Sequence, residues 1–287
     1  MEPLWFFLRV AIAALAATAL VLAVHWTVRR RALGSPKEVQ VRPRRWGAVA
    51  LCAGVVGGFL VLKGVPTSPF GEDGMSAHDR LFWAVILVGG LGALPWRRAL
   101  EVAAVCVPIL VVSKYHGLGE SGMLPLLELL GFALGGKLLL AAGDGAIRYR
   151  GGPSGAIQIG VVLGVLAAAI GASGSMFYAQ WAGTLGLGFG LITLAAWRDW
   201  NAGQLDGAST MLLAGAFALM AVEYSELDPW NAVLILGALP LSLVATHFLA
   251  ETKPRALIGW LVMLAPIIVA IVRVALAQEA DPYADYR

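Results

Sequence analysis

The sequence predicts an all-α bundle of about ten transmembrane helices with no soluble domain, and three observations lead to this fold class. The chain is 59% hydrophobic, and its mean hydropathy is +0.77. Only 14% of its residues are charged, whereas a soluble domain has about 25%, so polar residues are too few to cover a core in water. The charges stand in short blocks between long apolar runs, as loops stand between membrane-spanning helices.

Ten apolar runs have about the length that a helix needs to cross a bilayer, which is about 20 residues. The runs are 4–28, 46–63, 80–95, 99–115, 122–142, 156–178, 180–197, 208–222, 231–250 and 256–277. We therefore expect one integral membrane domain, 1–287. Because five runs lie on each side of the loop 143–155, an alternative organisation is two inverted halves, 1–142 and 156–287.

The first run is expected to be an uncleaved anchor, because its positive cluster follows the apolar stretch instead of preceding it. A basic loop then leads to the second run. We expect this loop to bind anionic lipids at the inner leaflet. The arginines expected to make this contact are Arg29, Arg30, Arg31, Arg44 and Arg45.

The distribution of Lys and Arg predicts the orientation, because positive residues gather in cytoplasmic loops. If the loop after the first run is cytoplasmic and the sides alternate, 14 of the 21 Lys and Arg fall inside. These residues are Arg29, Arg30, Arg31, Lys37, Arg42, Arg44, Arg45, Arg97, Arg98, Arg148, Arg150, Arg198, Lys253 and Arg255. The pattern favours a bacterial-type cytoplasmic membrane, ten crossings and both termini outside.

Glu128 is the most informative single residue, because a charge inside an apolar run is costly and faces protein or water. Arg9 and Arg273 are expected within one helical turn of Glu128 in depth, at about 1.5 Å per residue. The three residues are therefore a predicted intramembrane polar site. The alternative is that both arginines extend to the outer headgroups.

Two further pairs of residues are predicted to matter. Lys137 and Glu101 lie near the inner ends of neighbouring runs and could form an ion pair, unless Lys137 extends to the headgroups. Pro108 and Pro240 occupy matching positions in the two halves, and interrupted helices at matching places are typical of a transporter's midplane site. Prolines are also frequent in membrane helices without such a role.

Glycine pairs at a spacing of four residues predict close helix packing. These pairs are Gly54 and Gly58, Gly131 and Gly135, Gly160 and Gly164, and Gly186 and Gly190.

No sequence motif identifies a reaction. Cys52 and Cys106 stand alone in apolar runs, and no Cys/His spacing suggests a metal site. We expect no cofactor, no metal and no nucleic acid partner, and an enzyme is the least favoured class. The leading role is a permease for a small solute or ion, which should have a polar cavity converging on Glu128. The alternative is a non-catalytic scaffold or assembly subunit, with a packed interior and a broad apolar contact face. An intramembrane enzyme acting on lipid comes third.

Overall fold

The structure is a computed structural model, and it describes residues 3–33, 44–67, 75–94, 97–112, 123–149, 153–197, 206–248 and 255–279. Over these residues it contains ten α-helices. They are α1 (Pro3–Leu33), α2 (Arg44–Leu62), α3 (Ala77–Ala93), α4 (Arg97–Val111), α5 (Met123–Tyr149), α6 (Pro153–Ala172), α7 (Met176–Trp197), α8 (Gly207–Tyr224), α9 (Pro229–Phe248) and α10 (Arg255–Glu279). Each predicted run coincides with one helix, which confirms the all-α fold class.

The prediction of ten crossings is not confirmed. Seven helices, α1 and α5 to α10, are long and apolar enough to cross a membrane. The apolar part of α2 is the shorter stretch Trp46–Leu62. Helices α3 and α4 have 17 and 15 residues. Helices of that length extend about 22–26 Å, which is less than the ~30 Å hydrocarbon core of an average bilayer.

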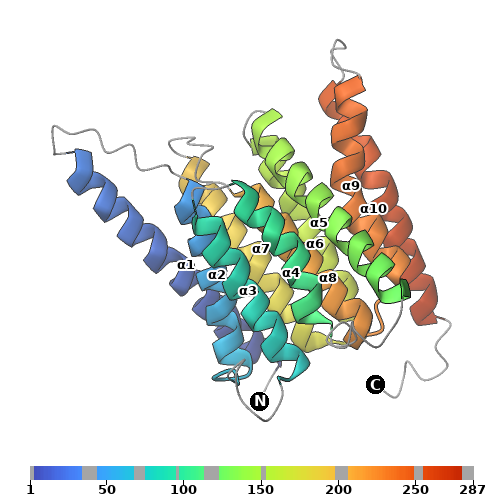
Figure 1. The fold of residues 1–287 in the computed structure, drawn as a ribbon, viewed down its shortest axis with the longest axis horizontal. Coiled ribbons are helices and arrows are strands. Elements are labelled where there is room, and N and C mark those ends of the chain that lie inside the picture. Colours follow the sequence, from blue (N-terminus) through green and yellow to red (C-terminus); the bar gives the residue numbers. More distant parts are fainter. Residues whose placement is uncertain are drawn as a thin grey trace.

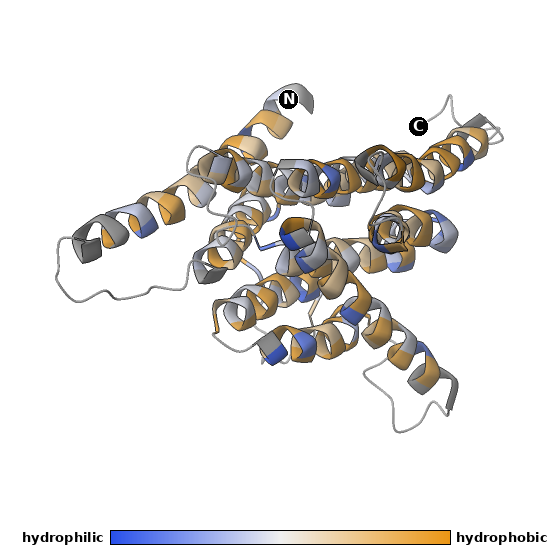
Figure 2. Cartoon of the chain, turned by 90° about the horizontal axis from the view of Figure 1, so that it is seen from above, coloured by the Kyte–Doolittle hydropathy of each residue, from blue (hydrophilic) through white to orange (hydrophobic). Residues whose placement is uncertain are grey.

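The helices stand side by side, with α1 at one edge of the bundle and the α9–α10 hairpin at the opposite edge (Figure 1). The first residues of α1 and the last residues of α10 lie at the same end (Figure 1). From above, hydrophobic residues run along the helices on the outer sides of the bundle (Figure 2). Large apolar side chains such as Leu20, Leu134 and Leu261 are more than half exposed, as expected for a surface in contact with lipid.

Helix α8 forms the centre of the bundle. All of its residues in 207–214 and 216–221 are buried, and it packs against α3, α4, α5, α6, α7 and α9. A helix without a polar face is typical of a buried core helix or a membrane span. Asp206 begins this helix, because its carboxylate accepts hydrogen bonds from the backbone N–H and the hydroxyl of Ser209, at 2.9 and 2.8 Å.

Glycines let the backbones around α8 come into contact. A Cβ atom added to Gly143 of α5 would lie 2.0 Å from the carbonyl oxygen of Gly207 in α8. A Cβ atom added to Gly207 would lie 2.3 Å from the carbonyl oxygen of Gly143. A Cβ atom on Gly155 of α6 would similarly lie 1.9 Å from the carbonyl oxygen of Ala146 in α5. Helix α5 therefore touches both α6 and α8 through backbone that leaves no room for a methyl group.

Among the predicted glycine pairs, close packing is present at Gly54 and Gly58 of α2. Cβ atoms there would lie 2.3 Å from the hydroxyl oxygen of Thr18 in α1 and 2.5 Å from the methyl carbon of Thr184 in α7. The other pairs do not make such contacts, because their Cβ atoms would meet nothing closer than 3.8 Å. These glycines are Gly131, Gly135, Gly160, Gly164, Gly186 and Gly190.

The contact between α5 and α8 gives a matched test. Gly143→Ala should lower the free energy of unfolding by about 1–3 kcal/mol, the usual cost of overpacking. Gly135→Ala, on the same helix but beside open space, should be neutral or stabilising by up to about 1 kcal/mol, because alanine favours helix over glycine. Unfolding in mixed micelles would measure both variants. Equal effects would contradict the close contact between Gly143 and Gly207.

Candidate functional site

The predicted polar site of Glu128, Arg9 and Arg273 is distributed over three separate helices. Arg9 lies on α1, which packs on α2 and α7, whereas Arg273 lies on α10, which packs on α9 and α6. These two helices are at opposite edges of the bundle (Figure 1). Glu128 is exposed on α5, which packs on α4, α6, α8 and α9. The structure does not bring Arg9 and Arg273 together, because equal depth in the bilayer does not specify which helices are neighbours.

Arg273 instead contacts the start of α9. Its guanidinium forms an ion pair with Asp228, and its Nε donates a hydrogen bond to the side-chain oxygen of Asn231 at 3.1 Å. The hydrogen bond from Arg273, together with one from the backbone N–H of Trp230, lowers the pKa of the Asp228 carboxyl below its usual value. The sequence carried a signal for this contact, because Asp228 comes directly before one apolar run and Arg273 lies near the same-side end of the next.

The predicted ion pair between Lys137 and Glu101 is not present among the described contacts. Helices α4 and α5 pack together, but Lys137 is exposed and Glu101 is half-buried, and no ion pair between them is recorded in the described part of the chain. The helices meet instead at Gly136, whose added Cβ atom would lie 3.0 Å from Ala104. The exposure of Lys137 fits a side chain that extends to the headgroups.

The prolines do not break their helices. Pro108 lies inside α4 and Pro240 lies inside α9, both are buried, and each helix continues past its proline. The predicted lipid-binding arginines remain a prediction. Helix α1 runs through Arg29–Arg31 and α2 begins at Arg44, but the side chains of these residues lie outside what the structure describes.

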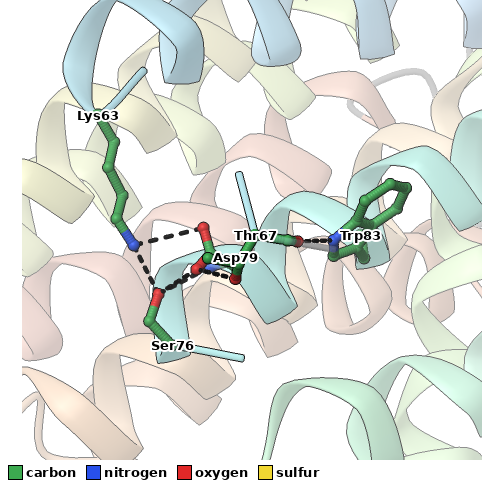
Figure 3. A network of polar contacts seen from close by, with 5 residues as sticks. All are labelled: Lys63, Thr67, Ser76, Asp79 and Trp83. Carbon is green, nitrogen blue, oxygen red and sulfur yellow. Dashed lines mark hydrogen bonds and ion pairs between the residues drawn. The ribbon is translucent and has the colours of Figure 1, made fainter. Parts of the chain in front are cut away.

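The best-defined polar network joins the end of α2 to the start of α3 (Figure 3). It contains Lys63, Thr67, Ser76, Asp79 and Trp83. The Lys63 ammonium lies 3.3 Å from Oδ1 of Asp79 and also donates to the hydroxyl of Ser76. The hydroxyls of Ser76 and Thr67 donate to Oδ2 of Asp79 at 2.6 and 2.7 Å. The Trp83 indole donates to the carbonyl oxygen of Thr67 at 3.0 Å.

Asp79 is the centre of this network, and its side chain is only 2% exposed. Burial raises the pKa of the carboxyl, but the hydrogen bonds from Ser76 and Thr67 and the charge of Lys63 outweigh it. The pKa of Asp79 therefore lies below its usual value, so the residue is a carboxylate at neutral pH. A buried carboxylate of this kind is stable only with its partners in place.

The residues on either side of Asp79 contact two further helices. The His78 ring stacks on Tyr178 of α7 at 5.0 Å between ring centres, and the edge of Phe177 meets it at 4.4 Å. The Arg80 guanidinium donates to the hydroxyl of Tyr224 in α8 at 3.4 Å. The first turn of α3 thus contacts α2, α7 and α8 through three consecutive side chains. We call His78, Asp79 and Arg80, with Lys63 and Ser76, the first-turn cluster.

The predicted runs 46–63 and 80–95 leave residues 76–79 in the loop between them, so sequence reasoning misses the cluster, although a local signal is present. Ser76 and Asp79 have the Ser-x-x-Asp spacing of a helix N-terminus before an apolar run. In the structure, the Ser76 hydroxyl accepts a hydrogen bond from the backbone N–H of Asp79 at 3.3 Å. The sequence does not reveal that Lys63, 16 residues earlier, supplies the counter-charge.

The chemistry of the first-turn cluster is that of a clamp between helices. In the part of the chain that the structure describes, no group of three or more His, Cys, Asp or Glu side chains could hold a metal ion. The oxygens of Asp79 are occupied by Lys63, Ser76 and Thr67.

No protein-family model, no curated protein and no solved structure matches the chain. The class of this protein is therefore inferred from its fold. Seven helices with the length and composition to cross a bilayer, together with an apolar outer surface, fit a multi-pass membrane protein.

The buried carboxylate predicts a strong effect of one substitution. Asp79→Asn should lower the free energy of unfolding by about 1–3 kcal/mol, less than the loss from a fully buried pair because Lys63 can reach water. In the Asp79→Asn background, Lys63→Gln should then lower the free energy of unfolding less than it does in the wild type. Asp228→Asn is the matched control, because its ion pair with Arg273 is largely exposed and should contribute about 0–1 kcal/mol. A double-mutant cycle with no coupling between Lys63 and Asp79 would disprove the clamp.

Proposed function

We propose that this protein is a non-catalytic scaffold or assembly subunit of a complex in a bacterial-type cytoplasmic membrane. The observation that carries the proposal is the packing of α8, whose residues 207–214 and 216–221 are all buried by neighbouring helices. The place where a transport path would cross the bundle is occupied by apolar side chains. Leu213, Phe217 and Trp181 are all completely buried there.

The positions of the polar groups favour a scaffold over a permease. A permease should have a polar cavity converging on Glu128, whereas Glu128 is an exposed residue of α5 between the exposed Leu127 and Leu130. Several buried hydroxyls donate to carbonyl groups of their own helices, as Thr18 does to Ala14 and Thr184 to Trp181. The hydrogen-bonding capacity of these hydroxyls is therefore satisfied within their own helices.

Cysteine accessibility separates the two roles. In a background with Cys52→Ala and Cys106→Ala, Ala214→Cys would place a thiol in the middle of α8, where the native side chain is fully buried. A membrane-impermeant maleimide should leave this thiol unmodified from both sides, because no water reaches it. Glu226→Cys, at the exposed segment after α8, should react and serves as the control.

Modification of Ala214→Cys would indicate a water-filled path and would favour the permease. The scaffold role makes a second demand. The wild-type chain, extracted with its native lipid into polymer nanodiscs, should be part of an assembly larger than one 30.1 kDa chain. Particles that each contain one copy of this chain and no other protein would contradict the scaffold role.

A further inference from the structure

The contact between α3 and α7 depends on a residue that can gain a proton near neutral pH. Of the three contacts made by the first turn of α3, Asp79 pairs as a carboxylate with Lys63, the residue after α2, and Arg80 contacts α8 through its guanidinium. His78 contacts α7 through its ring faces. Histidine is the side chain whose ordinary pKa places its charge change between pH 5 and 8.

We propose that His78 is a pH-sensitive latch, whose neutral ring holds the first turn of α3 on the first turn of α7 and whose protonation releases it. The geometry supports this role. The imidazole lies nearly parallel to the Tyr178 ring, with an angle of 12° between the planes, and the Phe177 ring meets it edge-on at 85°. Phe177 in turn packs on Trp181, so the latch is continuous with the aromatic core of α7.

The charges around His78 oppose an imidazolium. Lys63, directly after α2, carries a positive charge nearby, and α3 itself contributes Asp79 and Arg80. Tyr178 of α7 stacks on the imidazole, and the hydroxyl of Tyr224 in α8 accepts the hydrogen bond from Arg80. Asp79 attracts a proton on His78, but Lys63 already compensates the charge of this carboxylate. Burial first, and then the charge of Lys63, lower the pKa of His78 below its usual value.

The sign of the effect follows from this lowered pKa. A released His78 exposed to water has a pKa of about 6.5, whereas the latched ring takes up a proton only at lower pH. Below about pH 6.5 the released state therefore binds the proton more readily, and acidification shifts the equilibrium toward release. The α2–α3 clamp persists over this range, because the pKa of Asp79 is lowered from about 3.9. The latch does not depend on the scaffold role.

Hydrogen–deuterium exchange of the full chain in lipid nanodiscs tests the latch. Rates are compared at about pH 7.5 and about pH 5, on either side of the free histidine pKa, after correction for intrinsic exchange. Protection of the hydrogen-bonded amides of residues 79–80 and 178–179 should fall several-fold at the lower pH in the wild type. His78→Phe keeps a stacking ring without a titratable proton and should show no such pH response. His247→Phe, which replaces an exposed histidine at the end of α9, should behave like the wild type.

The latch is disproved if the wild-type protection of these segments does not change with pH, or if His78→Phe keeps the wild-type response. His78→Gln replaces His78→Phe if the phenylalanine variant does not fold, and the same two outcomes apply to it.

Discussion

The structure depends on the covering of α8. This helix has no polar face, and its residues 207–214 and 216–221 are all buried, so the helices that enclose it set its position. Six helices pack on it substantially, and a seventh, α2, touches it. In a membrane the hydrophobic effect does not drive helices together, because lipid is as apolar as a leucine side chain. Close backbone contact must supply the attraction, and this is where Gly143, Gly155 and Gly207 have their role.

The first-turn cluster serves the same arrangement at one end of the bundle. Helix α3 has only 17 residues, so contacts at its ends with neighbouring helices help to hold it in place. Its first turn makes three such contacts. Asp79 pairs with Lys63, the His78 ring stacks on α7, and the Arg80 guanidinium binds α8. Charge is costly inside the bilayer but tolerable where a helix begins, because water and headgroups reach the outer parts of the network. Lys63, whose side chain is 31% exposed, is such an outer part.

The sequence predicts the elements of this fold well and their neighbours poorly. The length of an apolar run predicts a membrane helix, and each of the ten predicted runs is a helix in the structure. Hydropathy does not reveal which helices are neighbours in the plane of the membrane. It therefore groups Arg9 and Arg273 by depth, although their helices lie at opposite edges of the bundle (Figure 1). Glycine spacing fails similarly, because Gly54 meets Thr18 whereas Gly131 faces open space. The Ser76–Asp79 spacing was readable, but its partner Lys63 required the tertiary structure.

Ten crossings remain a prediction, and it requires the short helices α2, α3 and α4 to cross the membrane together with the seven longer ones. All three contact α8, which is itself a candidate span of only 18 residues. Compartment-sensitive reporters fused after residues 73, 94 and 112 test this claim directly. Ten crossings place these fusions outside, inside and outside in turn. The same side for all three would show that α3 and α4 do not cross, and it would contradict the ten-crossing bundle.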